Sequence, residues 1–226
     1  MKQRMVVLAN SRKSGGFCMA GKALEDNGCV AGWVRPVSQA YERGLPLSRT
    51  LCSDGMPAQI LDVVEQDWGP NTPILHQREN RMMGPSTLSR CGRVSWPDLV
   101  CLADSSSSAL WLDGYSSNSG RNDRVPSDQL EHMPGSLKLL ALDNLVLSRT
   151  IGFEGQTKYR AEFCVAARSY NLALTDTIAT TWLGQCRRLE LPGSYVCVSL
   201  AVPFNDGFAY KVAAAIITMQ RAGSAT

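Results

Sequence analysis

The chain has 226 residues, of which 44% are hydrophobic and 19% are charged. This length suits one large domain or two small ones, and the apolar content excludes a globally disordered chain. The formal net charge of +3 is too small to require a polyanionic partner, but residues 1–40 hold six basic groups against two acidic ones. Because a local excess of charge sets the local field, we expect an anionic partner to bind near the N-terminal end.

Cysteine and histidine usage argues against a metal site. The eight cysteines include no CxxC pair, their spacings match no zinc pattern, and only two histidines are present. The sequence shows no signal peptide and no apolar run long enough to span a membrane. We therefore expect free thiols in a reducing cytoplasm, with no metal, no cofactor and no membrane partner.

The first predicted element is a buried strand over the apolar run 5–9. Four polar residues follow it, Asn10, Ser11, Arg12 and Lys13, ahead of a glycine pair. Glycines let the backbone approach a ligand closely, and guanidinium and ammonium groups suit phosphate oxygens. The segment therefore predicts a phosphate-binding site at the end of a strand.

A second predicted strand, at residues 32–37, carries Trp33 and Arg35. Their spacing of two residues places both side chains on one face of the strand. An indole beside a guanidinium is suited to stacking on a nucleobase next to a phosphate. The alternative is that Trp33 belongs to the core and the cations are only solvated. The grouping of these residues with Arg12 and Lys13 favours the binding hypothesis.

A dense polar cluster, HQREN, occupies residues 76–80. His76 is a candidate general base or base-edge reader, and Glu79 is a candidate to orient or protonate a substrate. Gln77 and Asn80 add amide groups that can bind a nucleic acid. The alternative interpretation is a surface turn without chemistry.

Residues 104–134 interrupt the pattern of regular elements, and within them DGYSSNSGRNDRVP has the composition of a long loop. Long loops in compact proteins are usually functional or disordered, so a ligand loop and a flexible linker are both open. The candidate ligand-binding residues of this loop are Ser117, Asn122 and Arg124, and Asp123 is a candidate carboxylate for proton transfer.

The remainder of the chain predicts mainly strands. Expected strands are 60–65 in the first half, then 136–142, 159–165, 169–174, 195–200 and 210–217, and the strand residues 145–149 either continue the strand at 136–142 or pair with it. A loop is expected at 68–73, and a helix at 178–186 has Thr175 or Asp176 as its N-cap. Short strands with one helix between the third and fourth are the order of a five-stranded OB-like barrel. The first half could hold a second barrel of similar size.

Several motifs, in the same order, resemble a bacterial family of dual OB-domain proteins. They are LANSRKSGGFCMAGK, GWVRPVS, HQREN, DGYSSNSGRNDRVP, YNLALTD, VSLAVPF and YKVAAAI. With this resemblance, the predicted fold is mainly β, with two tandem OB-like barrels at 1–103 and 135–226, a connecting or ligand loop at 104–134, and a few short helices. The resemblance also implies a link to nucleic acid, with a place beside bacterial nucleic-acid modification or phage-defence genes. It implies no established reaction.

Three functions are compatible with these observations. The first is binding of a nucleic acid or nucleotide, most simply a single strand or an exposed base. The second is an enzyme acting on a nucleotide or base through His76, Glu79 and Asp123. The third is a scaffold or ligand sensor that works with other proteins of its operon in a defence complex. We rank binding above catalysis and catalysis above a scaffold.

Overall fold

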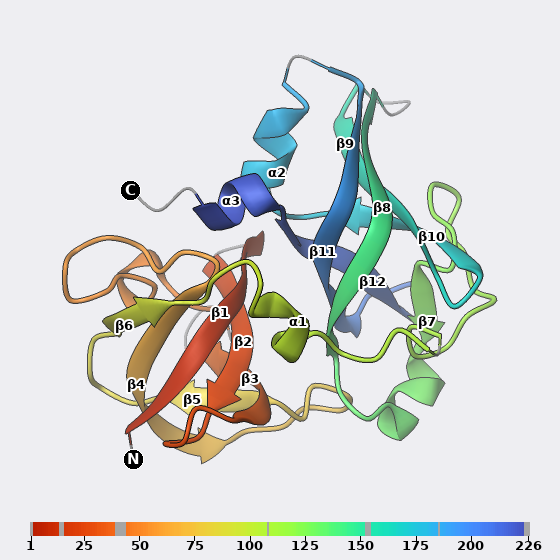
Figure 1. The fold of residues 1–226 in the computed structure, drawn as a ribbon. Helices are drawn as coiled ribbons and strands as arrows, with labels where there is room; N and C mark the ends of the chain where they lie inside the picture. The colour runs from red at the N-terminus through yellow and green to blue at the C-terminus, as the bar shows by residue number, and fades with distance from the viewer. Residues whose placement is uncertain are drawn as a thin grey trace. The chain divides into compact units, whose positions relative to one another are not determined.

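The computed structural model describes residues 2–13, 16–38, 44–107, 109–151, 155–184 and 186–223. The chain divides into two compact units (Figure 1). The first is Met1–Leu102 together with Ala222–Thr226, and the second is Ala103–Arg221. The predicted connecting segment 104–134 is therefore part of the second unit.

The first unit is a closed five-stranded barrel. Its strands are β1 (Lys2–Lys13), β2 (Gly16–Leu24), β3 (Val30–Val37), β4 (Asp62–Asn71) and β5 (Asn80–Met83), with β6 (Ser89–Arg93) added beside β4. The long strand β1 pairs antiparallel with both β2 and β4, and a parallel pairing of β3 with β5 closes the barrel. The unit also contains a 3-10 helix, η2 (Leu47–Arg49), and the short helix α1 (Leu99–Leu102).

Strand β4 corrects the predicted loop at 68–73, because it continues through Gly69 and Pro70 to Asn71. Trp68 is 6% exposed and packs in the barrel core, and its ring nitrogen donates to the Gln3 carbonyl at 3.3 Å. The pairing of β4 with β5 is irregular between Trp68 and Asn71, which accommodates a proline that cannot donate to the ladder. The free energy gained by burying the Trp68 indole exceeds the tendency of Gly69 and Pro70 to end a strand.

The second unit repeats the same strand connections. Its strands are β7 (Arg124–Pro126), β8 (Leu137–Ile151), β9 (Thr157–Val165), β10 (Arg168–Leu174), β11 (Arg188–Pro203) and β12 (Phe208–Ile217). Strand β8 pairs with both β9 and β11, and a parallel pairing of β10 with β12 closes the barrel. A five-stranded barrel with this order in each unit is the OB arrangement, so the predicted fold class of two OB-like barrels is confirmed.

The predicted helix between the third and fourth strands of this barrel is α2 (Thr177–Trp182), with Asp176 as its N-cap. The Asp176 carboxylate accepts from the amides of Ile178 at 3.0 Å and Ala179 at 3.2 Å. Two predicted strands at 136–142 and 145–149 are one continuous strand, β8. Its great length lets one strand serve two neighbours in the closed barrel.

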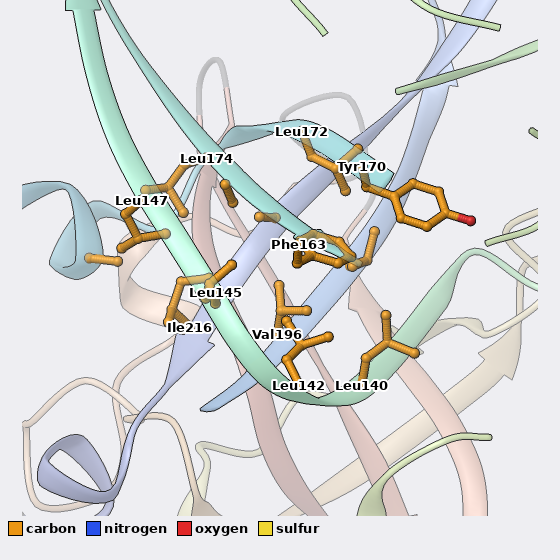
Figure 2. Close-up of a cluster of buried hydrophobic side chains, with 14 of the residues drawn as sticks. Leu140, Leu142, Leu145, Leu147, Phe163, Tyr170, Leu172, Leu174, Val196 and Ile216 are labelled. Atoms are coloured by element: carbon orange, nitrogen blue, oxygen red, sulfur yellow. The ribbon is translucent and has the colours of Figure 1, made fainter. Parts of the chain in front are cut away.

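Apolar residues from all the barrel strands fill the second core. Figure 2 shows leucines of β8 and β10 meeting Val196 of β11 and Ile216 of β12. Phe163 and Tyr170 stack within this core, with ring centroids 5.5 Å apart. Each fully buried side chain of this size contributes about 1.5–3 kcal/mol relative to exposure. This burial fixes the strand register and therefore the positions of the outward-facing side chains.

The segment before β8 packs on the barrel instead of crossing open solvent. It contains β7, which pairs with β12, and the 3-10 helix η3 (Ser127–His132). Val125 and Leu130 form a small separate core with Leu200 and Ala209. The last element is α3 (Met219–Gly223). In the part of the chain that the structure describes, no helix is long and apolar enough to cross a membrane.

Candidate nucleic-acid interface

In the first barrel, two of the predicted motifs lie side by side. The parallel pairing of β3 with β5 sets Arg35 opposite Asn80, and the Arg35 amide donates to the Glu79 carbonyl at 2.9 Å. The HQREN segment is thus the connection between the fourth and fifth barrel strands. In OB barrels, that connection, the turn between the first two strands and the face of strands 2 and 3 form the ligand-binding side.

The polar groups of the HQREN segment bond to one another and to β3. Arg35 and Glu79 form an ion pair at 3.3 Å, with 10% and 6% of their side chains exposed. Asn80 donates to the Gln77 side chain at 3.3 Å, and His76 is fully buried. A buried pair of opposite charges presents little net charge to a ligand, so this cluster positions the connection between β4 and β5.

Trp33 lies on the outer face of the first barrel, because its neighbour Val34 packs in the core. The indole is half-buried. Lys22 stands opposite Trp33 in the pairing of β2 with β3, and its ammonium is 5.2 Å from the centroid of the ring. This distance fits a cation–π contact. The indole is therefore held in place by a cation of the neighbouring strand.

The predicted phosphate-binding segment lies on the opposite face of the sheet. Asn10 and Arg12 pair with Met19 and Phe17 of β2, whose side chains face the core side. Asn10 donates to the carbonyl of Ala58 at 3.0 Å. The exposed Arg12 lies over the ring of Phe17, 5.8 Å from its centroid.

Ser11 is buried, and the side chain of Lys13 lies outside the described residues. Arg12 and Arg35 thus point to different sides of the β-sheet. The structure brings together the 33–35 and 76–80 segments but does not place Arg12 on the same surface as Trp33 and Arg35.

In the second barrel, the predicted loop residues fold the loop itself. Asp123 is 1% exposed, and its two oxygens accept from the Ser117 amide at 2.7 Å and the Ser117 hydroxyl at 2.6 Å. The Arg160 guanidinium also reaches Asp123, at 3.4 Å. Asn122 accepts from the Gly114 amide at 2.9 Å and donates to the Ser169 carbonyl at 3.0 Å.

The Asp123 carboxylate therefore holds the loop together, because it accepts three hydrogen bonds from Ser117 and Arg160. Gly120 is required beside it, because a Cβ at that position would lie 1.8 Å from the Asp123 carboxylate. Of the three predicted catalytic residues, Asp123 belongs to the second unit and His76 and Glu79 to the first. Their catalytic role stays a prediction.

A buried polar cluster anchors the start of this loop to the barrel. The Lys211 side chain has no exposed surface, and its ammonium donates to the Leu112 carbonyl at 2.8 Å and to Asp113 at 3.0 Å. The other Asp113 oxygen accepts from the Tyr170 hydroxyl at 2.8 Å, and that hydroxyl accepts from the Leu110 amide at 3.1 Å. Figure 2 shows the Tyr170 hydroxyl pointing away from the other labelled core residues.

Burial changes the acidity of two of the groups that hold Asp113. The third group is the exposed guanidinium of Arg168, 3.3 Å from the same carboxylate. Desolvation raises the pKa of Tyr170 to about 12, and the hydrogen bond to Asp113 adds to the effect. Desolvation also lowers the pKa of Lys211, while Asp113 opposes that change. The tyrosine therefore remains a protonated donor at neutral pH, as the anchor requires.

The anchored loop covers a pocket of about 640 Å³ on the outer face of β9 and β10. These are the second and third barrel strands, the face at which OB barrels take ligands. The lining residues come from the loop, β8, β9 and β10: Asn118, Ser119, Gly120, Arg121, Asp143, Asn144, Val146, Glu162, Phe163, Cys164, Ser169, Tyr170 and Asn171. Sequence analysis left a ligand loop and a flexible linker both open for this segment and named none of these lining residues.

An aromatic surface lies beside the turn between β11 and β12; we define it as Tyr115, Phe204, Phe208 and Tyr210 with Arg124. Phe204 is 60% exposed and meets Tyr210 edge to face, with centroids 5.4 Å apart. Tyr115 is 40% exposed and lies 6.2 Å from Phe208, and the Arg124 guanidinium is 4.0 Å from the Phe208 centroid. Among the predicted binding residues whose side chains the structure describes, Arg124 is thus the one that lies over a ring of this surface.

Sequence analysis missed the four rings of this surface. The available signal was the run PFNDGFAY, in which a tight-turn sequence is flanked by aromatic residues. Metal binding has no comparable support, since the described residues contain no group of three or more His, Cys, Asp or Glu side chains that could hold an ion.

The sequence matches a family model described as "Dual OB-containing domain" over residues 3–216, a span that runs from β1 to β12. Among solved structures, it resembles "Crystal structure of the tetrameric p202 HIN2" at 8% identity, covering 94% of this chain and 87% of that chain, with a TM-score of 0.30. It also resembles "Structure of murine DNA binding protein bound with ds DNA" at 7% identity, covering 96% and 99%, with a TM-score of 0.32. Likenesses this weak carry no argument about function. No curated protein matches the sequence.

The loop anchor can be tested with Tyr170→Phe, which removes the hydroxyl that serves Leu110 and Asp113. We expect the free energy of unfolding to fall by about 1–3 kcal/mol, because buried polar groups lose their partner. Urea denaturation measures this loss, and the Leu110 amide should exchange its hydrogen faster. The matched control is Tyr159→Phe, at a half-buried tyrosine packed against the same core. Equal losses in the two variants would contradict the anchor.

Proposed function

The chain belongs to the dual OB-containing domain family, and on that premise we propose that it binds single-stranded nucleic acid. The observation that carries the proposal is the aromatic surface of the second barrel. A group of rings that includes large exposed ones is typical of a contact surface. Phe204 lies in the connection between the fourth and fifth strands, Phe208 and Tyr210 follow it in β12, and Tyr115 lies beside Phe208. This connection belongs to the ligand side of OB barrels.

The geometry of the aromatic surface suits a flexible strand of bases. Phe204 and Tyr115 offer exposed ring faces, and stacking on such rings contributes about 1–3 kcal/mol per base without requiring a particular sequence. Arg124 supplies a guanidinium for a neighbouring phosphate or for stacking. Its partner Asp206 is 3.9 Å away, a distance at which the ion pair is loose enough to open for a phosphate.

The first barrel contributes two separate contacts in this proposal, on opposite faces of its sheet. Arg12 is exposed at the end of β1 and is suited to a phosphate. Lys13, whose side chain lies outside the described residues, is proposed for the same contact. Trp33 presents a half-buried indole on the outer face of the barrel for one base. In the proposal, Asn10, Ser11, Arg35, Gln77 and Asn80 support these contacts, as Ser117 and Asn122 support the loop of the second barrel.

The finer part of the proposal places the protein in a bacterial nucleic-acid modification or phage-defence system in the cytoplasm. Support for this comes from the family to which the chain belongs, because the family resemblance links such chains to modification and defence genes. A protein that recognises single strands or exposed bases suits such a system, since modification and invasion both expose unpaired nucleic acid. Operon-encoded proteins are the partners that this role requires.

Removal of one exposed ring tests the proposed function directly. Phe204→Ala should weaken binding of a fluorescent single-stranded oligonucleotide about 5- to 150-fold, the range that about 1–3 kcal/mol represents. Fluorescence anisotropy with single-stranded DNA and RNA at low salt measures the affinity. The matched control is Ile178→Ala, which removes an exposed apolar side chain from α2 of the same barrel. A flat titration of the unaltered protein with both nucleic acids would refute the proposal.

The first barrel is tested by two variants in the same assay. Trp33→Ala should reduce affinity by about 1–3 kcal/mol if one base stacks on the indole. Arg12→Ala should make the dependence of binding on salt shallower by about one unit of slope, because one phosphate contact is lost. Trp96→Ala, at a half-buried tryptophan of the same unit, is the control. Unchanged affinity and slope would restrict binding to the second barrel.

The role in a larger system is tested by capture from the native host. With tagged protein, we expect nucleic acid and operon-encoded proteins to co-purify, and nuclease treatment to release the proteins that are bridged by nucleic acid. Mass spectrometry with and without nuclease measures this. Capture that is insensitive to nuclease and free of nucleic acid would indicate a protein scaffold instead.

A further inference from the structure

The pocket beneath the loop of the second barrel differs chemically from the aromatic surface. Its volume of about 640 Å³ lies within the range of about 300–1,000 Å³ that small-molecule pockets occupy. Its charged lining residues are two carboxylates, Asp143 and Glu162, against one guanidinium, Arg121. This balance disfavours a phosphate group inside the pocket, because a dianion would face more negative than positive charge.

The pocket instead contains polar side chains whose hydrogen-bonding atoms are mostly unused within the described part of the protein. The side chains of Asn118, Asp143 and Asn144 make no hydrogen bond to another described residue, and all three are exposed. Glu162 accepts a long bond from the Ser148 hydroxyl, at 3.4 Å on one oxygen. Its second oxygen accepts none from the described residues. The pocket is thus supplied with free acceptors, two of them carboxylates.

The base and flank of the pocket suit a planar ligand. Val146 is a buried apolar residue of β8 and lies opposite Glu162 in the pairing of β8 with β9. Arg121 is exposed on the covering loop, where its flat guanidinium can lie over a ring. Asn171 is fixed by Arg160, whose guanidinium donates to the Asn171 side-chain oxygen at 2.7 Å. The acceptor at position 162 therefore stands beside a rigid amide on an apolar base.

The loop that covers the pocket also reaches the aromatic surface. Tyr115 belongs to that surface, while Asn118 and Arg121 of the same loop line the pocket. A strand lying across the rings can therefore leave one nucleotide beside the pocket. The phosphates of that nucleotide then stay outside the pocket, near exposed arginines such as Arg121, and its base enters the pocket.

We propose that this pocket takes one extruded nucleobase that carries an exocyclic amino group, so adenine, cytosine or guanine, and discriminates against thymine and uracil. The inference rests on the proposed function and names the part of the nucleic acid that the pocket reads. A carboxylate accepts hydrogen bonds and cannot donate them, so Glu162 and Asp143 favour a base edge that donates. At the corresponding places on their base-pairing edges, thymine and uracil carry carbonyl oxygens, whereas adenine, cytosine and guanine carry an amino group.

The test compares oligothymidylate with the same oligomer carrying a single adenine, cytosine or guanine at its centre. The unaltered protein should bind the amino-bearing oligomers about tenfold more tightly by fluorescence anisotropy, which is 1.4 kcal/mol. Glu162→Gln should reduce this preference to about twofold or less, since the amide can also donate to a carbonyl. Asp143→Asn, at an exposed residue, gives an independent second variant. Glu131→Gln, at an exposed glutamate of η3 outside the pocket, should retain the full preference.

The outcomes separate this inference from the proposed function. Equal binding of all four oligomers, unchanged in Glu162→Gln, would overturn the base pocket while leaving single-strand binding intact; a sugar or phosphate occupant would give that result. No binding of any oligomer would overturn the proposed function itself. Thermal unfolding of each variant identifies a loss of affinity that comes from misfolding.

Discussion

The buried ion pair between Lys211 and Asp113 holds together the parts of the second barrel on which the proposed ligand binding depends. Lys211 belongs to β12, and Asp113 lies 98 residues earlier, at the start of the covering loop. A buried charge that loses its partner is strongly destabilising, so neither residue can relax alone. Tyr170 adds a second connection to the same carboxylate from β10. The pocket and the aromatic surface both use the loop that this pair fixes.

The fold of the second barrel follows from its sequence more directly than that of the first. Strand β9 alternates exposed and buried residues along TKYRAEFCV, and Asp176 provides an acceptor where α2 begins. In the first barrel, β5 carries Arg81-Met82-Met83 and shows no such alternation, so its parallel pairing with β3 decides its structure. Trp68 likewise became part of a strand through burial, which a local reading of Gly69 and Pro70 does not reveal.

The candidate sites were less predictable, because they depend on register and on contacts between distant residues. The pairing of β1 with β2 shifts between Val7 and Ala9. One extra residue in a strand reverses the faces of all that follow, so Arg12 points to the core side of the sheet. The rings of the aromatic surface come from Tyr115 and from residues near 204–210, and only the closed barrel unites them. Spacing along the sequence could show neither effect.

The ends of the covering loop anchor it to the barrel, and its tip lines the pocket. The side chains of Asp113, Ser117, Asn122 and Asp123 bond to the barrel or to the loop itself. The side chains of residues 118, 119 and 121 line the pocket, and Arg121 is tied to Asn171 of β10 only through its backbone. Substitutions at these three tip positions can therefore change the shape and polarity of the pocket rim without disturbing the anchors. Only Gly120 among the tip residues is constrained, by its close approach to Asp123. The second barrel is thus a frame on which new ligand preferences can arise by point mutation, in nature or by design.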